Sequence, residues 1–106
     1  MSAGSRRFAI IGLTTITALI HLVVLNVLLG QISPPFVLNG IGFFVLLYAY
    51  LNKVPAGREG LVRFAFIAFT LVTILAWVAI GDKSDPLGWF TKAVEALLLI
   101  VLWTDR

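Results

Sequence analysis

The chain has 106 residues, of which 60% are hydrophobic and 12% are charged, and its formal net charge is +3. Since a typical soluble domain is about 45–50% apolar and about 25% charged, this composition excludes a soluble enzyme, a soluble binding module and a disordered chain. The basic residues form no run interleaved with aromatic residues, which argues against a nucleic-acid partner, and the lack of cysteine excludes disulfides and thiolate metal ligands. We therefore expect an integral membrane protein.

Four apolar stretches predict four transmembrane helices joined by short connections. The first covers residues 8–29, which at about 1.5 Å per residue just spans a hydrocarbon core of roughly 30 Å, and the prolines at 34 and 35 end it. The others cover residues 36–51, 61–80 and 87–103. The second and fourth are short, so they should cross the bilayer with little tilt or be anchored by their aromatic ends. In the turn before residue 87, Asp85 or Ser84 suits a helix N-cap.

Short connections make consecutive helices antiparallel neighbours. We therefore expect one all-α domain, residues 1–106, folded as an up-down-up-down four-helix membrane bundle. Positive charge is favoured in cytoplasmic segments, which predicts both termini in the cytoplasm and the protein in the cell membrane. Six basic residues fall on the side of the termini, against Lys83 and Lys92 on the other; the six are Arg6, Arg7, Lys53, Arg58, Arg63 and Arg106.

Polar side chains inside the predicted spans are costly in a bilayer and therefore mark candidate site residues. In the first span Thr14, Thr17 and His21 share a stripe of roughly 100° with Ala18, and this stripe should face another helix. In the second span, small residues at 40 and 42 should let a neighbouring helix approach. The candidate site residues are His21, Asn39, Thr73, Lys92 and Glu95. Counted at about 1.5 Å per residue, all five fall in the outer half of the bilayer.

Three interpretations of these residues stay open. They are hydrogen-bonding contacts that hold the helices together, with Lys92 reaching the outer interface and pairing with Glu95. Alternatively, His21 and Glu95 face each other in a water-accessible outer pocket, where they bind a ligand or carry a proton. Finally, His21 is a candidate axial ligand of haem or a chlorophyll-type pigment. No other cofactor and no metal site is expected.

The first and fourth spans are adjacent in such a bundle, which predicts a direct contact between His21 and Glu95. A hydrogen-bonding partner would relieve the cost of a carboxylate at that depth. Lys92 is the competing partner, and it should sit closer to water. We therefore expect His21→Leu to disturb the bundle more than Lys92→Ala.

Three short elements carry a resemblance to a known group of proteins. They are Ile20-His21-Leu22, the stretch from Leu38 to Phe43 with the pattern Leu-x-Gly-x-Gly-Phe, and Lys92-Ala93-Val94-Glu95. Through them the chain resembles small prokaryotic four-span membrane proteins. The resemblance implies the four-span fold over most of the chain, and it implies no activity, ligand or catalytic residue.

The sequence carries no enzyme signature, since it lacks a GxSxG elbow, an HExxH motif, a P-loop and a GxGxxG loop. Its short connections leave no soluble domain. The first hypothesis is a non-enzymatic accessory subunit of a larger membrane complex, such as an electron-transfer or photosynthetic assembly, with other membrane subunits and lipid as partners. The alternatives are a small homo-oligomeric transporter or channel with an outer polar site, and a haem or pigment carrier acting through His21.

Overall fold

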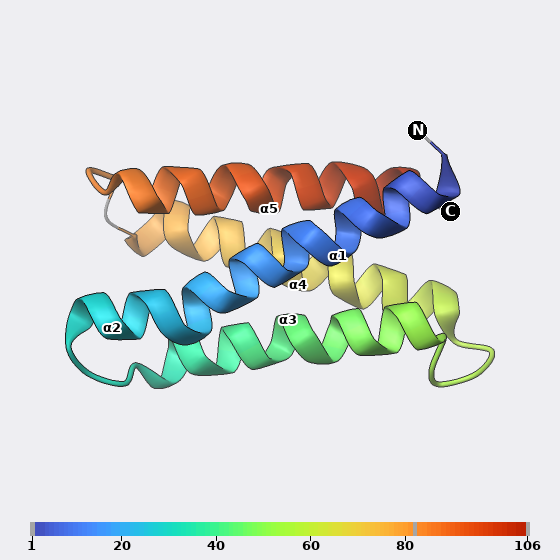
Figure 1. The fold of residues 1–106 in the computed structure, drawn as a ribbon, viewed down its shortest axis with the longest axis horizontal. Helices are drawn as coiled ribbons and strands as arrows, with labels where there is room; N and C mark the ends of the chain where they lie inside the picture. The colour runs from blue at the N-terminus through green and yellow to red at the C-terminus, as the bar shows by residue number, and fades with distance from the viewer. Residues whose placement is uncertain (1, 82, 106) are drawn as a thin grey trace.

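The computed structural model describes residues 2–81 and 83–105, and it is all-helical (Figure 1). The first long helix has three parts: α1 (Ala3–Leu19), a π-helical segment η1 (Ile20–Val24) and α2 (Leu25–Leu29). Three further helices follow, α3 (Pro34–Asn52), α4 (Glu59–Ile80) and α5 (Pro86–Thr104). Four helical stretches in the described residues are long and apolar enough to cross a membrane: Ala3–Leu28, Pro34–Asn52, Glu59–Ile80 and Pro86–Thr104.

Each predicted span lies within one of these helices, but every helix is longer than predicted. The two spans expected to be short are helices of 19 residues each, because Pro34 and Pro86 begin them. A proline fits the first helical position, where its missing N–H would have no partner in any case. The N-cap of α5 is Asp85, whose side chain accepts a hydrogen bond of 3.0 Å from the backbone N–H of Leu87, as one of the two predicted caps.

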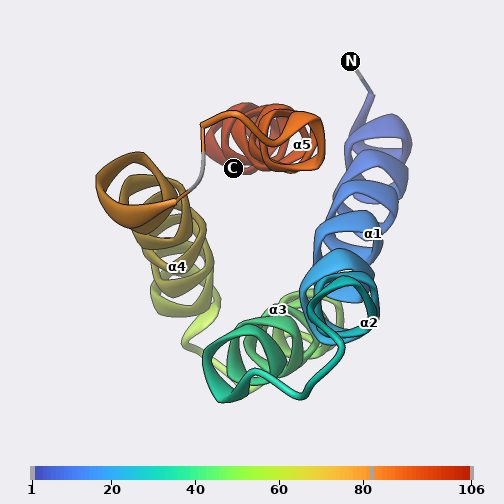
Figure 2. The same ribbon diagram turned by 90° about the vertical axis from the view of Figure 1, so that its left-hand side faces the viewer.

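The four long helices form a ring. Viewed along the bundle, α1 lies between α3 and α5, and α4 closes the ring on the opposite side (Figure 2). Consecutive long helices run in opposite directions, and the first turns of α1 lie at the same end as the last turns of α5 (Figure 1). We call this the terminal end of the bundle, and the other the distal end.

The apolar core lies towards the terminal end. Its fully buried members include Ile10, Phe43, Phe66, Leu98 and Leu102. The polar stripe predicted on the first span is also buried, since Thr14, Thr17 and Ala18 are 0% exposed and His21 is 6% exposed. The prediction that this stripe faces another helix is therefore confirmed.

Hydrogen bonds from polar side chains connect the helix ends at the terminal end. Arg6 Nε donates to Asp105 Oδ1 over 2.9 Å, and the Tyr50 hydroxyl donates to Asp105 Oδ2. Arg63 donates to two carbonyl oxygens of the last turn of α5, through Nε to Leu102 at 2.9 Å and through Nη2 to Trp103 at 2.6 Å. These bonds link α1, α3 and α4 to the end of α5.

Because Asp105 takes part in these hydrogen bonds as a carboxylate, we expect the stability of the fold to fall at acidic pH. Burial alone would raise the pKa of Asp105, but hydrogen bonds from Tyr50 and Arg6, with the positive charges of Arg6 and Arg63, together lower it. A lowered pKa stabilises the fold above the unfolded value of about 3.9, and this stability is lost as the pH falls through the lower folded value. We expect Asp105→Asn to flatten the loss of thermal stability below about pH 4, measured by circular dichroism in detergent. An acid limb that is unchanged in Asp105→Asn would contradict this role.

Candidate functional site

The π-helical segment η1 places the candidate site at the distal half of the first span. A π-turn displaces the regular backbone hydrogen bonds and leaves carbonyl oxygens that need other donors. Asn26 supplies them, since its Nδ2 donates to His21 O at 3.2 Å and to Leu22 O at 2.8 Å. Its Oδ1 accepts from the backbone N–H of Ser33 at 2.5 Å. The Asn26 side chain thus supplies hydrogen-bond donors to two carbonyl oxygens of the π-turn and connects the turn to the loop before α3.

The imidazole of His21 is fixed by its own helix. Its Nδ1 lies 2.8 Å from the carbonyl oxygen of Thr17, and since a carbonyl only accepts, Nδ1 carries a proton. The other ring nitrogen, Nε2, lies 3.9 Å from Glu95 Oε2. The rings of Phe36 and Phe43 pack near the imidazole, at 6.1 and 6.3 Å between centroids. Nε2, the nitrogen that remains for ligation when Nδ1 is protonated, thus faces the Glu95 carboxylate.

The carboxylate of Glu95 is completely buried and has two close partners. Lys92 Nζ lies 2.6 Å from Oε1, and the Thr17 hydroxyl donates to Oε2 over 2.6 Å. Lys92 is itself only 8% exposed. His21 and Glu95 are adjacent as expected, but the order of partners is the reverse of the expected one, because the side chain of Lys92 reaches one turn along α5 to form the direct ion pair.

A second polar pair joins α3 to α4. Asn39 Nδ2 donates to Thr73 Oγ1 over 2.8 Å, while the Thr73 hydroxyl donates to Phe69 O over 2.9 Å. Since the Thr73 proton is used in that second bond, its oxygen must accept, which fixes the orientation of the Asn39 amide. Asn39 Oδ1 is buried and has no hydrogen-bond partner among the described residues.

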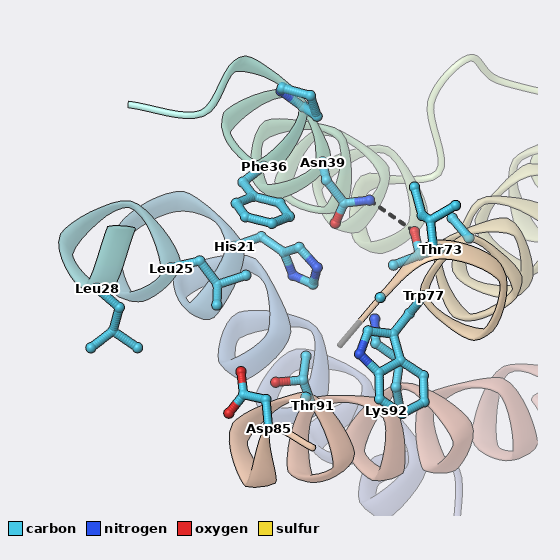
Figure 3. A pocket seen from close by; sticks show the side chains of 15 residues that line it. His21, Leu25, Leu28, Phe36, Asn39, Thr73, Trp77, Asp85, Thr91 and Lys92 are labelled. Atoms are coloured by element: carbon cyan, nitrogen blue, oxygen red, sulfur yellow. Dashed lines mark hydrogen bonds between the residues drawn. The ribbon is translucent and has the colours of Figure 1, made fainter. Parts of the chain in front are cut away.

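These two clusters border a cavity of about 520 Å³ at the distal end, which we call the polar pocket (Figure 3). Side chains from every long helix line it, and most of them are apolar or aromatic. Of the predicted site residues, His21, Asn39, Thr73 and Lys92 line the pocket, whereas Glu95 lies behind Lys92 and His21. The lining also includes Leu25, Leu28, Phe36, Ala76, Trp77, Ile80, Asp85 and Thr91.

One tryptophan side chain lines the polar pocket and packs against a second tryptophan outside it. Trp77 lines the pocket and stacks edge-on against Trp89, with 4.9 Å between ring centroids. Gly88 makes room for this arrangement, because a Cβ at that position would lie 2.8 Å from the Trp77 Nε1. Lys83 Nζ lies 5.5 Å from the centre of the Trp77 ring, so a cation sits beside the aromatic wall.

Comparisons with known proteins add no relative. No protein-family model, no curated protein and no solved structure matches the chain. The residues that the structure describes also contain no group of three or more histidine, cysteine, aspartate or glutamate side chains that could hold a metal ion.

Sequence reasoning missed two residues of this site. Thr17 was assigned to a buried stripe, but its hydroxyl is a direct partner of Glu95. Residue count gave no signal for this contact, because it placed Thr17 about 6 Å deeper from the outer side than Glu95. Asn26 supports the π-turn, and no local pattern distinguishes a π-turn from a regular helical turn.

Proposed function

We propose that the chain is an integral membrane protein that binds a small amphiphilic molecule in the polar pocket, with both termini in the cytoplasm. The observation that carries the proposal is the composition of the pocket wall. A cavity of about 520 Å³ with apolar and aromatic sides and a few convergent polar groups is the usual form of a small-molecule site. The excess of basic residues at the terminal end supports the orientation, which places the pocket on the outer side.

The polar groups suggest which end of the molecule goes deepest. Lys92 Nζ uses one of its three hydrogens for Glu95 Oε1, so it can donate to a second acceptor. His21 borders the same space, with Nδ1 held by Thr17 O. A ligand whose polar end accepts hydrogen bonds would therefore lie against Lys92, and its apolar part would lie against Phe36, Trp77 and Leu25.

Filling the pocket should abolish this binding. Ala76 lines the pocket, whereas Ala79 lies one turn further along α4, is exposed and does not line it. We expect protein purified in mild detergent from its own membranes to carry a small molecule that mass spectrometry detects after solvent extraction. The Ala76→Trp variant should lose that molecule, because the indole would occupy the space, and the matched Ala79→Trp variant should keep it.

Loss from both variants, or retention by both, would contradict binding in the polar pocket.

A role as an accessory subunit is the second candidate, supported by the large apolar side chains exposed on every long helix, such as Phe8, Val45, Phe64 and Ile100. These surfaces need lipid or protein to cover them. The same purification separates the two candidates, since a subunit should co-purify with a larger partner, and a binding protein should be isolated alone or as copies of itself.

A further inference from the structure

A second cavity, of about 740 Å³, lies at the terminal end of the bundle, far from the residues of the polar pocket. We call it the basic pocket. It is lined by Arg7 of α1, Lys53 at the end of α3 and Arg63 of α4, and its carboxylates are Glu59 and Asp105. Because Arg6 pairs with Asp105, the charge that remains in the pocket is positive.

The basic side chains of this pocket have N–H groups that are available to a ligand. Within residues 2–81 and 83–105, Arg7 and Lys53 are exposed and make no described hydrogen bond or ion pair. Arg63 is oriented by the α5 carbonyl oxygens that receive its Nε and Nη2 hydrogens, while Nη1 makes none of the described hydrogen bonds. Its guanidinium is therefore held in place with one nitrogen still able to donate.

The backbone of α4 adds to this positive surface. Arg58 precedes the helix and makes no side-chain cap hydrogen bond. The first amide groups of a helix have no partner within it, and they favour an anion. Glu59 and Gly60 carry two of these amides, and both residues line the basic pocket.

We propose that the basic pocket binds the phosphate group of an anionic phospholipid. The pocket lies where the four candidate spans begin or end, which is the level of lipid headgroups in a bilayer. Basic pockets between transmembrane helices are a known means of binding anionic headgroups. Exposed apolar side chains stand one or two positions from pocket-lining residues, where acyl chains would lie; they are Phe8, Leu61 and Phe64. This proposal does not depend on what the polar pocket binds.

Lipid selectivity in solution tests the proposal. Native mass spectrometry of the purified protein in detergent, titrated with phosphatidylglycerol or phosphatidylcholine, should show tighter binding of the anionic lipid. The double variant Arg7→Gln/Lys53→Gln should bind phosphatidylglycerol about thirty-fold more weakly, which is about 1 kcal/mol for each charge. Both side chains are exposed, so the melting temperature should stay close to that of the unchanged protein.

The control is Arg58→Gln/Lys83→Gln, which removes the same net charge from two exposed residues that do not line the basic pocket. This variant should bind phosphatidylglycerol nearly as well as the unchanged protein. Equal affinity for the two lipids, or an equal loss in both double variants, would overturn the proposal. A third titration with inorganic phosphate distinguishes the source of the anion, because phosphate alone binding as tightly as the lipid would show that the pocket serves a soluble anion.

Discussion

Replacing Lys92 with methionine should lower the free energy of unfolding by about 3–5 kcal/mol, the usual cost of removing one partner of a buried ion pair. Lys92 Nζ and Glu95 Oε1 are 2.6 Å apart, and the Glu95 side chain is 0% exposed. Without the ammonium group, the carboxylate would keep only the Thr17 hydroxyl as a close donor. Denaturant titration in detergent micelles, followed by circular dichroism, measures the change.

The double variant Lys92→Met/Glu95→Leu should recover most of this loss, because apolar residues of similar size often replace a buried ion pair at little cost. The Thr17 hydroxyl can then donate to a backbone carbonyl of its own helix. The matched single variant is Lys83→Met, which removes an exposed lysine and should have little effect. A Lys92→Met variant as stable as Lys83→Met would show that the ion pair does not stabilise the fold.

A methyl group at Gly40 should also destabilise the bundle, by about 1–3 kcal/mol, the typical cost of overpacking. A Cβ at this position would lie 2.8 Å from the Ala18 carbonyl oxygen and 2.9 Å from Leu22 Cβ. The first of these atoms belongs to backbone that runs directly into η1, so it cannot move aside without disturbing the π-turn. The same denaturant titration, applied to Gly40→Ala, tests the expectation.

Gly12→Ala is the matched control, since Gly12 also lies inside a candidate span but has nothing within 4 Å of an added Cβ. Alanine is favoured over glycine in a helix interior by about 0.5–1 kcal/mol, so this variant should be as stable as the unchanged protein or slightly more so. A Gly40→Ala variant that behaves like Gly12→Ala would mean that α3 can move away from the first span.

The sequence predicted those features that depend on local pattern and on residue count. The apolar stretches located every candidate span, and the helical spacing of Thr14, Thr17 and His21 identified a face that is buried. The turn chemistry before residue 87 named Asp85 as a cap. The small residue at 40 predicted a close approach, which the first span makes to Gly40.

The features that the sequence could not predict depend on contacts between distant segments or on backbone geometry. Arg6, Tyr50 and Asp105 meet only because three helix ends coincide, and no spacing rule connects them. The choice of partner for Glu95 depended on side-chain reach, since residue counts placed His21 at the same depth but could not show that Lys92 Nζ would approach within 2.6 Å. The π-turn at η1 was hidden because its residues are as apolar as a regular helical turn.

Hydrogen bonds connect different helices at the two ends of the bundle. At the distal end the hydrogen bonds between two side chains join the helices in pairs, with Thr17 bound to Glu95 between α1 and α5, and Asn39 bound to Thr73 between α3 and α4. At the terminal end Tyr50 and Arg63 cross from α3 and α4 to the end of α5. The two pairs are nevertheless tied to each other at the distal end, because the connections from α2 to α3 and from α4 to α5 cross between them and Asn26 Oδ1 accepts from the backbone N–H of Ser33. A molecule that enters the polar pocket would therefore displace apolar and aromatic side chains between the pairs, while the Thr17–Glu95 and Asn39–Thr73 hydrogen bonds stay in place.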